Sequence, residues 1–258
     1  MFTLIIITAF AILISLIIFY RKSTNKTIDT DQKERYSSLL QQNVLFYRKL
    51  DESKKIRFVE KVCSFLGRTT IEGIGTAIDD KDRVLVAASA IIPIFNFGNW
   101  EYRNLTNVIL YRDTFNHEFE YEGENRSLLG MVGTGYLNGQ MVLSKIALHK
   151  GFDLSGGVQN TAIHEFVHLL DKADGYIDGI PELLLQNSYI LPWITAMEQE
   201  IRRIQSGKSD IDPYALTHES EFFAVVAEYF FEKPEQFEEK HPELFSIVNQ
   251  MFNPESKV

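Results

Sequence analysis

The spacing of apolar residues predicts a helix over residues 160–171, which read NTAIHEFVHLLD. Its apolar positions recur at intervals of three and four and form one stripe: Ile163, Phe166, Val167 and Leu170. Asn160 or Thr161 suits the start of this helix, because a short polar side chain accepts hydrogen bonds from the free N–H groups of the first turn. Gly175 suits its end.

A second amphipathic helix is predicted between Thr217, a suitable N-cap, and Pro234, which stops it. Its apolar stripe is rich in aromatic residues: Phe222, Phe223, Val226, Tyr229 and Phe230. Glu221 and Glu228 share a different stripe, two helical turns apart. On such a helix these carboxylates are expected to be buried, and a buried charge needs a partner, for example a metal ion.

Further periodic segments complete one domain of helices and strands. Helical spacing covers Tyr36–Leu66, with Asp51 as an internal N-cap and Gly67 as the end. The apolar run 84–92, closed by Pro93, predicts a buried helix under a sheet. The remaining segments are a helix over 188–206 and two buried strands, 107–111 (NVILY) and 140–145 (QMVLSK).

Residues 1–20 carry no charged side chain and predict a transmembrane helix, because about 20 helical residues span the hydrocarbon core of a bilayer. Arg21 and Lys22 follow directly. By the positive-inside rule they place the rest of the chain in the cytoplasm. We therefore expect a single-pass anchor in the cytoplasmic membrane over 1–20, a juxtamembrane linker over 21–34 and one domain over 35–258 that faces the cytoplasm.

The composition excludes some classes of protein. A formal net charge of −9 and the lack of a basic patch argue against nucleic acid as a partner. Cys63 is the sole cysteine, so the chain forms no internal disulfide, and this residue fits a buried apolar position. The chemistry of the domain must therefore come from other residue types.

His164, Glu165 and His168 form the pattern H-E-x-x-H inside the first helix. Two histidines four residues apart lie on one helix face and can bind the same metal ion. A glutamate beside the first ligand can accept a proton from a water on that ion. A catalytic zinc site also needs a third protein ligand and an open position.

Residue spacing leaves both Glu221 and Glu228 open as the third ligand. Asp171 lies close behind the histidines on the same helix face, so it suits a supporting position that orients a histidine or a neighbouring helix. His117 and His149 are expected in loops away from the site.

Together the two helices resemble the MtfA-like zinc peptidases, a gluzincin-type family of bacteria. The matching segments are HEFVHLLD from His164, DPYA from Asp212 and ESEFFAVVAEYFFEKP from Glu219. Weaker similarity covers the two strands and the helix over 54–66. The resemblance implies an α+β, zincin-like metallopeptidase domain with a small mixed sheet and an H-E-x-x-H helix.

The resemblance also implies roles for individual residues. Glu228 matches a glutamate that is not a ligand, Glu165 matches the general base, and Tyr214 matches a tyrosine that stabilises the developing oxyanion. The best-known member is a soluble cytosolic protein that binds a glucose-responsive transcriptional repressor, from which the expected membrane anchor departs. The residues that would hold one Zn²⁺ per chain are His164, His168 and Glu221.

These features predict a membrane-anchored zinc peptidase that acts on a peptide or protein substrate. The alternative is a regulator-binding, anti-repressor-like protein whose zinc site is structural or of low activity. Glu165 argues against this alternative, because a structural zinc site is closed by four ligands and has no use for a base. The strand residues expected to line the cleft and pair with an extended peptide are Gln140, Met141, Val142, Leu143 and Ser144.

Overall fold

The computed structural model describes residues 28–254, except 117–126, 134–138, 154–158, 183 and 186. The described strands are β1 (Thr70–Ile74), β2 (Asn107–Tyr111), β3 (Gly130–Val132) and β4 (Gln140–Ser144). The described helices are α2 (Thr30–Asn43), α3 (Leu45–Arg48), α4 (Glu52–Arg68), α5 (Asp80–Ile94), α6 (Lys145–Gly151), α7 (Thr161–Asp171), α8 (Asn187–Gln205), α9 (Glu219–Glu232), α10 (Pro234–Lys240) and α11 (Pro242–Phe252). Two short 3₁₀ helices are η2 (Lys172–Asp174) and η3 (Pro213–Leu216).

The four strands form one mixed sheet in the order β1-β2-β4-β3. β1, β2 and β4 are parallel, and β3 runs antiparallel to β4 at one edge. Alternate side chains of β2 and β4 enter the main core, whereas Val142 points to a small second cluster with Tyr111 and Phe115. The predicted α+β class, the small mixed sheet and both predicted strands are therefore confirmed.

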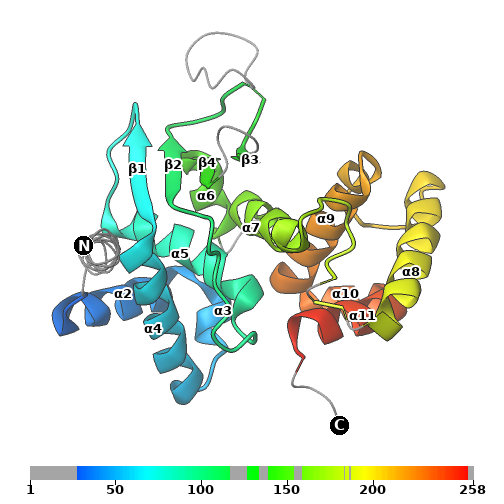
Figure 1. Cartoon of the computed structure of the whole chain (residues 1–258), viewed down its shortest axis with the longest axis horizontal. Helices are drawn as coiled ribbons and strands as arrows, with labels where there is room; N and C mark the ends of the chain where they lie inside the picture. Colours follow the sequence, from blue (N-terminus) through cyan, green and yellow to red (C-terminus); the bar gives the residue numbers. More distant parts are fainter. Residues whose placement is uncertain are drawn as a thin grey trace, which may run out of the picture.

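Helix α7 lies at the centre of the fold. Figure 1 shows the sheet and helices α2–α5 on one side of α7, and helices α8–α11 on the other. Phe166 of α7 is fully buried and contacts Phe65 of α4 and Tyr102, at ring-centroid distances of 5.9 and 5.2 Å. On the second side α7 packs along α9. One continuous core therefore surrounds the helix that carries the H-E-x-x-H pattern.

The predicted buried helix is α5, and nearly all of its length is inaccessible to solvent. It is capped by Asp79 and Asp82, which each accept a hydrogen bond from the other's backbone N–H. It packs against α2, α4, α6 and α7, and Arg83 ties it to β1 through the carbonyl of Ile71. The helix runs through Pro93, so the expectation that this proline closes it was wrong.

Other predicted boundaries also shift. Helix α2 begins at Thr30, inside the expected linker, because Asp29 caps it by accepting a hydrogen bond from the Gln32 N–H at 2.8 Å. Helix α4 starts after Asp51 as predicted but passes Gly67. His149 lies in α6 rather than in a loop, because Ser144 caps this helix by accepting a hydrogen bond from the Ala147 N–H. The His149 Nε2 is 2.7 Å from the carboxylate of buried Asp82.

Two expectations fall on undescribed residues. The expected membrane anchor over 1–20 and His117 both lie outside the part of the chain that the structure describes. Within the described ranges, no helix combines the length and the apolar character needed to cross a bilayer.

A buried ionic cluster joins the C-terminal helices to the segment that leads into η3. The His241 side chain is 1% exposed, with Nδ1 3.1 Å from Glu200 of α8 and Nε2 2.8 Å from Asp210. Asp210 also accepts hydrogen bonds from Tyr229 of α9 and Lys240 of α10. The cluster therefore holds the chain next to η3 against three helices.

The cluster predicts a pH-dependent stability. Burial lowers the pKa of His241, but the two carboxylates outweigh burial and raise it above its usual value. A raised histidine pKa stabilises the fold fully below pH ~6.5, and this contribution is lost as pH rises through the folded-state pKa. In urea unfolding at pH 6, His241→Gln should lower the free energy of unfolding by about 3 kcal/mol.

At pH 9 the difference between the wild type and His241→Gln should shrink. An equal difference at both pH values would contradict the assignment of a charged imidazole to this cluster.

Candidate metal centre

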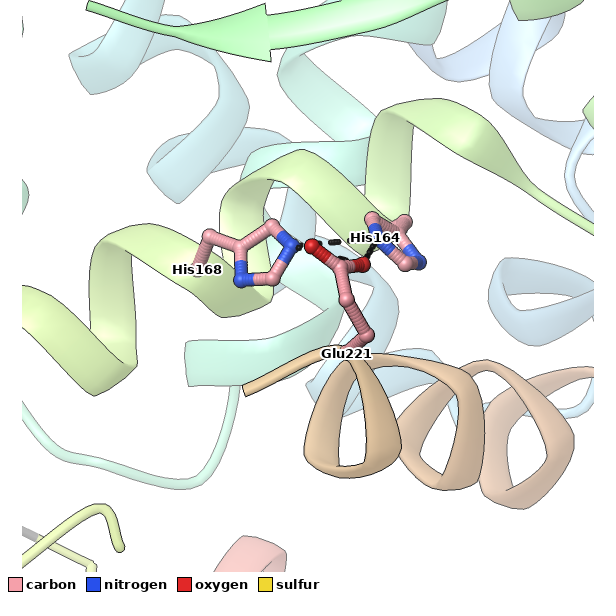
Figure 2. A group of neighbouring side chains, drawn as sticks. All are labelled: His164, His168 and Glu221. Atoms are coloured by element: carbon pink, nitrogen blue, oxygen red, sulfur yellow. Dashed lines mark hydrogen bonds and ion pairs between the residues drawn. The ribbon is translucent and has the colours of Figure 1, made fainter. Parts of the chain in front are cut away.

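Helix α7 begins at Asn160, one of the two predicted caps, whose side chain accepts a hydrogen bond from the Ile163 N–H at 3.2 Å. It ends at Asp171, and Gly175 closes the following 3₁₀ turn at a φ of 109°. The helical repeat sets His164 and His168 one above the other, with ring centroids 4.7 Å apart. Both rings point toward α9 (Figure 2).

Helix α9 supplies the carboxylate. It is capped by His218, which accepts a hydrogen bond from the Ser220 N–H at 3.2 Å, so the prediction of Thr217 as the N-cap was wrong. Glu221 lies in its first turn and reaches toward α7. The helix ends at Glu232, just before Pro234, as predicted.

Three donor atoms from the two helices converge (Figure 2). His164 Nε2 lies 2.9 Å from Glu221 Oε2 and 3.0 Å from His168 Nε2, and His168 Nε2 lies 3.3 Å from the same carboxylate oxygen. Ligand atoms about 2.0–2.1 Å from a tetrahedral zinc ion lie roughly 3.3–3.4 Å from one another. Two imidazoles and one carboxylate at nearly this spacing fit zinc. Among the described residues, no other group of histidine, cysteine and acidic side chains gathers in this way.

The second nitrogen of His164 is also engaged. Its Nδ1 lies 2.7 Å from Glu228, which in turn accepts a hydrogen bond from the Asn160 N–H at 2.6 Å. The Asn160 side chain then donates to Glu232 at 2.9 Å. A proton on Nδ1 that is held by a carboxylate leaves Nε2 free to face a metal ion. Glu228 therefore orients His164 from behind.

These contacts and burial shift the pKa values of the buried groups at the site. Burial lowers the pKa of His164, but hydrogen bonds to Glu221 and Glu228 raise it to about 10. Burial raises the pKa of Glu221, but its contacts with both histidines outweigh burial and hold that pKa below its usual value. Burial also raises the pKa of Glu232, to about 7. The carboxylate of Glu221, which faces both histidines, is therefore kept ionised.

Glu165 lies next to the three converging donor atoms, but its carboxylate is not one of them. It is 7% exposed, and burial raises the pKa of its carboxyl. The edge strand β3 passes very close to the Glu165 side chain. A Cβ added at Gly130 would lie only 2.6 Å from Glu165 Oε1. Only glycine allows the strand to approach so closely. The backbone of the sheet edge therefore borders the predicted base.

Tyr214 comes to the same site from η3. Its ring centroid lies 6.0 Å from that of His164, and the side chain is half exposed. Burial raises the pKa of the phenol, and the negative charges of Glu221 and Glu165 raise it further. The hydroxyl is therefore held in its protonated form, as a hydrogen-bond donor.

Asp171, the predicted supporting residue, lies at the end of α7 and binds the following loop. It is fully buried, and its carboxylate accepts a hydrogen bond from the Gly179 N–H at 2.9 Å. Burial raises its pKa to about 6. The nitrogen Nδ1 of His164 is held by Glu228 of the facing helix, whereas the hydrogen bond of Asp171 goes to the loop at Gly179. The role of Asp171 in orienting a histidine or a neighbouring helix stays a prediction.

The prediction that β4 pairs with a peptide was wrong. Both of its edges are already hydrogen-bonded, to β2 on one side and to β3 on the other, so its backbone has no free groups to offer. Of the strands described at this end of the sheet, β3 is the edge, and it packs against α7. The residues excluded as a peptide-pairing strand are Gln140, Met141, Val142, Leu143 and Ser144.

Comparison with known proteins agrees with this geometry. The family described as glucose-regulated metallo-peptidase M90 matches residues 19–253. The chain belongs to this family. The predicted MtfA-like resemblance is thereby confirmed.

Relatives extend along most of the domain. The chain is 26% identical over 228 residues to the uncharacterized protein slr2042 of Synechocystis sp., which covers 84% of this chain and 82% of that protein. It is 30% identical over 177 residues to Mlc titration factor A of Pectobacterium atrosepticum, covering 62% and 64% of the two chains. With Mlc titration factor A of Escherichia fergusonii it shares 27% identity over 216 residues, covering 79% and 80%.

Two supporting residues of this M90 site differ in how far the sequence revealed them. Glu228 was visible as a carboxylate in phase with Glu221, but spacing alone did not separate a ligand from a group behind a ligand. Gly130 gave no signal, because it belongs to a strand of three residues whose partner was not predictable. A second buried glutamate, two helical turns from the ligand glutamate on the same helix, is the sequence pattern that indicates a supporting residue of this kind.

Glu228→Gln tests the orienting contact. The substitution removes the charge that holds Nδ1 of His164 but keeps the shape of the side chain. Zinc binding to the full chain should weaken roughly 10- to 100-fold, the effect typical of partners that support a ligand. Competition with a chromophoric chelator measures this. Glu239→Gln, which removes the same charge from an exposed position on α10, should leave the affinity unchanged.

Unchanged zinc affinity in a folded Glu228→Gln protein would contradict the role assigned to Glu228.

Proposed function

We propose that the protein is a zinc-dependent peptidase. The observation that carries this proposal is the convergence of two imidazole nitrogens and one carboxylate oxygen within 3.3 Å, with a buried glutamate beside them. Three protein ligands leave a tetrahedral zinc ion one open position, which is the arrangement of catalytic sites. The residues that would hold the ion are His164, His168 and Glu221.

Zinc in such a site acts as a Lewis acid and brings the pKa of water down toward ~7. Glu165 is the general base of the proposal. Its carboxylate accepts the proton of the attacking water and then delivers it to the amine of the leaving peptide. Its buried position beside β3 keeps bulk water from competing for that proton.

Tyr214 is the proposed donor to the oxyanion that forms when a peptide carbonyl is attacked. Its position beside His164 and its raised pKa support this role, because a phenol must keep its proton in order to donate. One such donor stabilises the transition state by about 3–4 kcal/mol.

The outer edge of β3, which pairs with no further strand among the described residues, is the proposed binding site for the substrate backbone. An extended peptide added to a sheet edge forms main-chain hydrogen bonds that do not depend on sequence. The close approach of Gly130 to Glu165 supports this choice, because a peptide paired there would lie next to the base. This edge replaces β4 in the proposal.

A second candidate function is the binding of a regulatory protein. The relatives of known name are called Mlc titration factor A, which describes a factor that titrates Mlc. By analogy, this chain would bind a transcriptional regulator of that kind. Binding requires neither Glu165 nor turnover, so the two functions differ in what they demand of the site.

We also propose that residues 1–20 anchor the chain in the cytoplasmic membrane with the domain in the cytoplasm. The support is the uncharged run of 20 residues followed by Arg21 and Lys22.

Chelation and one substitution test the peptidase. Removal of zinc should abolish cleavage of a mixed peptide library by the full chain, and added zinc should restore it. Glu165→Gln should bind zinc like the wild type but lower kcat by roughly 10²- to 10⁴-fold, because it removes the base alone. Glu239→Gln serves as the control with the same chemical change.

Cleavage that survives chelation would overturn the proposal. A wild type that binds zinc, cleaves nothing and binds a regulator would favour the second function.

A charged pair in the apolar run tests the anchor. Leu13→Arg with Leu16→Arg should move the protein from the membrane pellet to the soluble fraction, since each central arginine costs about 2.5–3.5 kcal/mol in a bilayer. A wild type found wholly in the soluble fraction would rule the anchor out.

A further inference from the structure

The structure assigns Gly179 as the positioning residue that sets the distance between the two ligand-bearing helices at the end of the site beside His168 and Glu221. This inference rests on the proposed zinc site and concerns how that site is held. At one end, Glu228 and Glu232 of α9 join the Asn160 cap of α7 through hydrogen bonds. At the other end, beside His168 and Glu221, the connection runs through a loop, and Gly179 is its centre.

Both backbone groups of Gly179 are bound to buried side chains of different helices. Its N–H donates to Asp171, the last residue of α7, at 2.9 Å. Its carbonyl accepts a hydrogen bond from the Trp193 indole of α8 at 2.7 Å. Asp171 and Trp193 are both fully buried. Since buried polar groups without partners are costly, these two bonds fix where the Gly179 backbone lies.

The third contact of Gly179 is with the first turn of α9. A Cβ at this position would lie 2.3 Å from the Glu219 carbonyl oxygen and 2.5 Å from its carbon. Both are main-chain atoms, so no side chain can turn away to make room. Gly179 also has a φ of 75°, which glycine adopts without strain. Glycine is thus required here both by its conformation and by the close approach.

This contact is near enough to Glu221 to set its position. Glu219 opens α9, and Glu221 follows in the same turn. Trp193 strengthens the arrangement, because its ring lies 5.9 Å from both Phe222 and Phe223 on the same helix. The loop around Gly179 therefore packs against the segment of α9 that carries Glu221, the carboxylate ligand.

The overlap that a Cβ at position 179 would cause determines how far the metal ligand on α9 would be displaced. Real Cβ atoms do not approach closer than 3.0 Å, so alanine at 179 requires a shift of at least 3.0 − 2.3 = 0.7 Å. Metal–ligand distances tolerate deviations of only about 0.2 Å. A displacement of the first turn of α9 by 0.7 Å would move Glu221 out of reach of an ion held by the two histidines.

Zinc affinity of the full chain, measured by competition with a chromophoric chelator, tests the inference. Gly179→Ala should weaken zinc binding roughly 10- to 100-fold. In a Glu221→Ala background, where the carboxylate is already absent, the same change should alter the remaining affinity by less than about twofold. A merely structural role would lower affinity by the same factor in both backgrounds, and that result would overturn the inference.

Gly175→Ala is the matched control. Gly175 lies in the same loop with a φ of 109°, but a Cβ there meets nothing within 4 Å. It imposes backbone strain without a contact on α9, so zinc affinity should stay within about twofold of the wild type. A loss equal to that of Gly179→Ala would assign the effect to loop strain and overturn the role of the close approach.

Trp193→Phe keeps the inference testable if Gly179→Ala does not fold. It keeps an aromatic ring next to α9 and removes the donor to the Gly179 carbonyl together with part of the buried indole volume, which the Glu221→Ala background controls for. Zinc affinity should fall about fivefold or more in the wild-type background and not in Glu221→Ala. Unchanged affinity in a folded Trp193→Phe protein would overturn the inference. A wild type that binds no zinc would instead refute the proposed function itself.

Discussion

The site depends on a buried imidazole held between two carboxylates of one helix. His164 of α7 faces Glu221 with one ring nitrogen and Glu228 with the other, at 2.9 and 2.7 Å. Three ionisable groups buried together cost several kcal/mol in desolvation unless their charges are balanced and their hydrogen bonds are made. A divalent cation held by His164, His168 and Glu221, as proposed above, would supply that balance. The packing of α7 on α9 therefore determines whether the groups of the proposed metal site come together.

The rest of the fold keeps these two helices together. α5 and the sheet support α7 from one side, while α8 and the C-terminal helices support α9 from the other. The hydrogen bonds of Asn160 and the loop contact of Gly179 then fix the relative position of α7 and α9 at opposite ends. A metal centre built on two rigid helices, rather than on loops, holds its geometry within the few tenths of an ångström that zinc requires.

Membership of the M90 family joins two kinds of evidence. The family is described as glucose-regulated metallo-peptidases, and two of the relatives reported above are called Mlc titration factor A. The geometry bears on the first description, since a group of two histidines and one glutamate that could hold a metal ion lies beside the buried side chain of Glu165. The two functions proposed above therefore differ in whether they need this group and Glu165.

The sequence alone determined whatever depends on local periodicity. The 3.6-residue repeat set His164 above His168, and the aromatic stripe of α9 placed Glu221 and Glu228 in phase. It did not determine which carboxylate met which nitrogen, since that depends on how two helices pack across a gap of some fifty residues. The order of the described strands likewise places β3, not β4, at the edge of the sheet. The sequence could not show this, because hydrogen bonding between strands depends on contacts far apart along the chain. The same holds for Gly179, whose contacts with three helices exist only once the chain has folded.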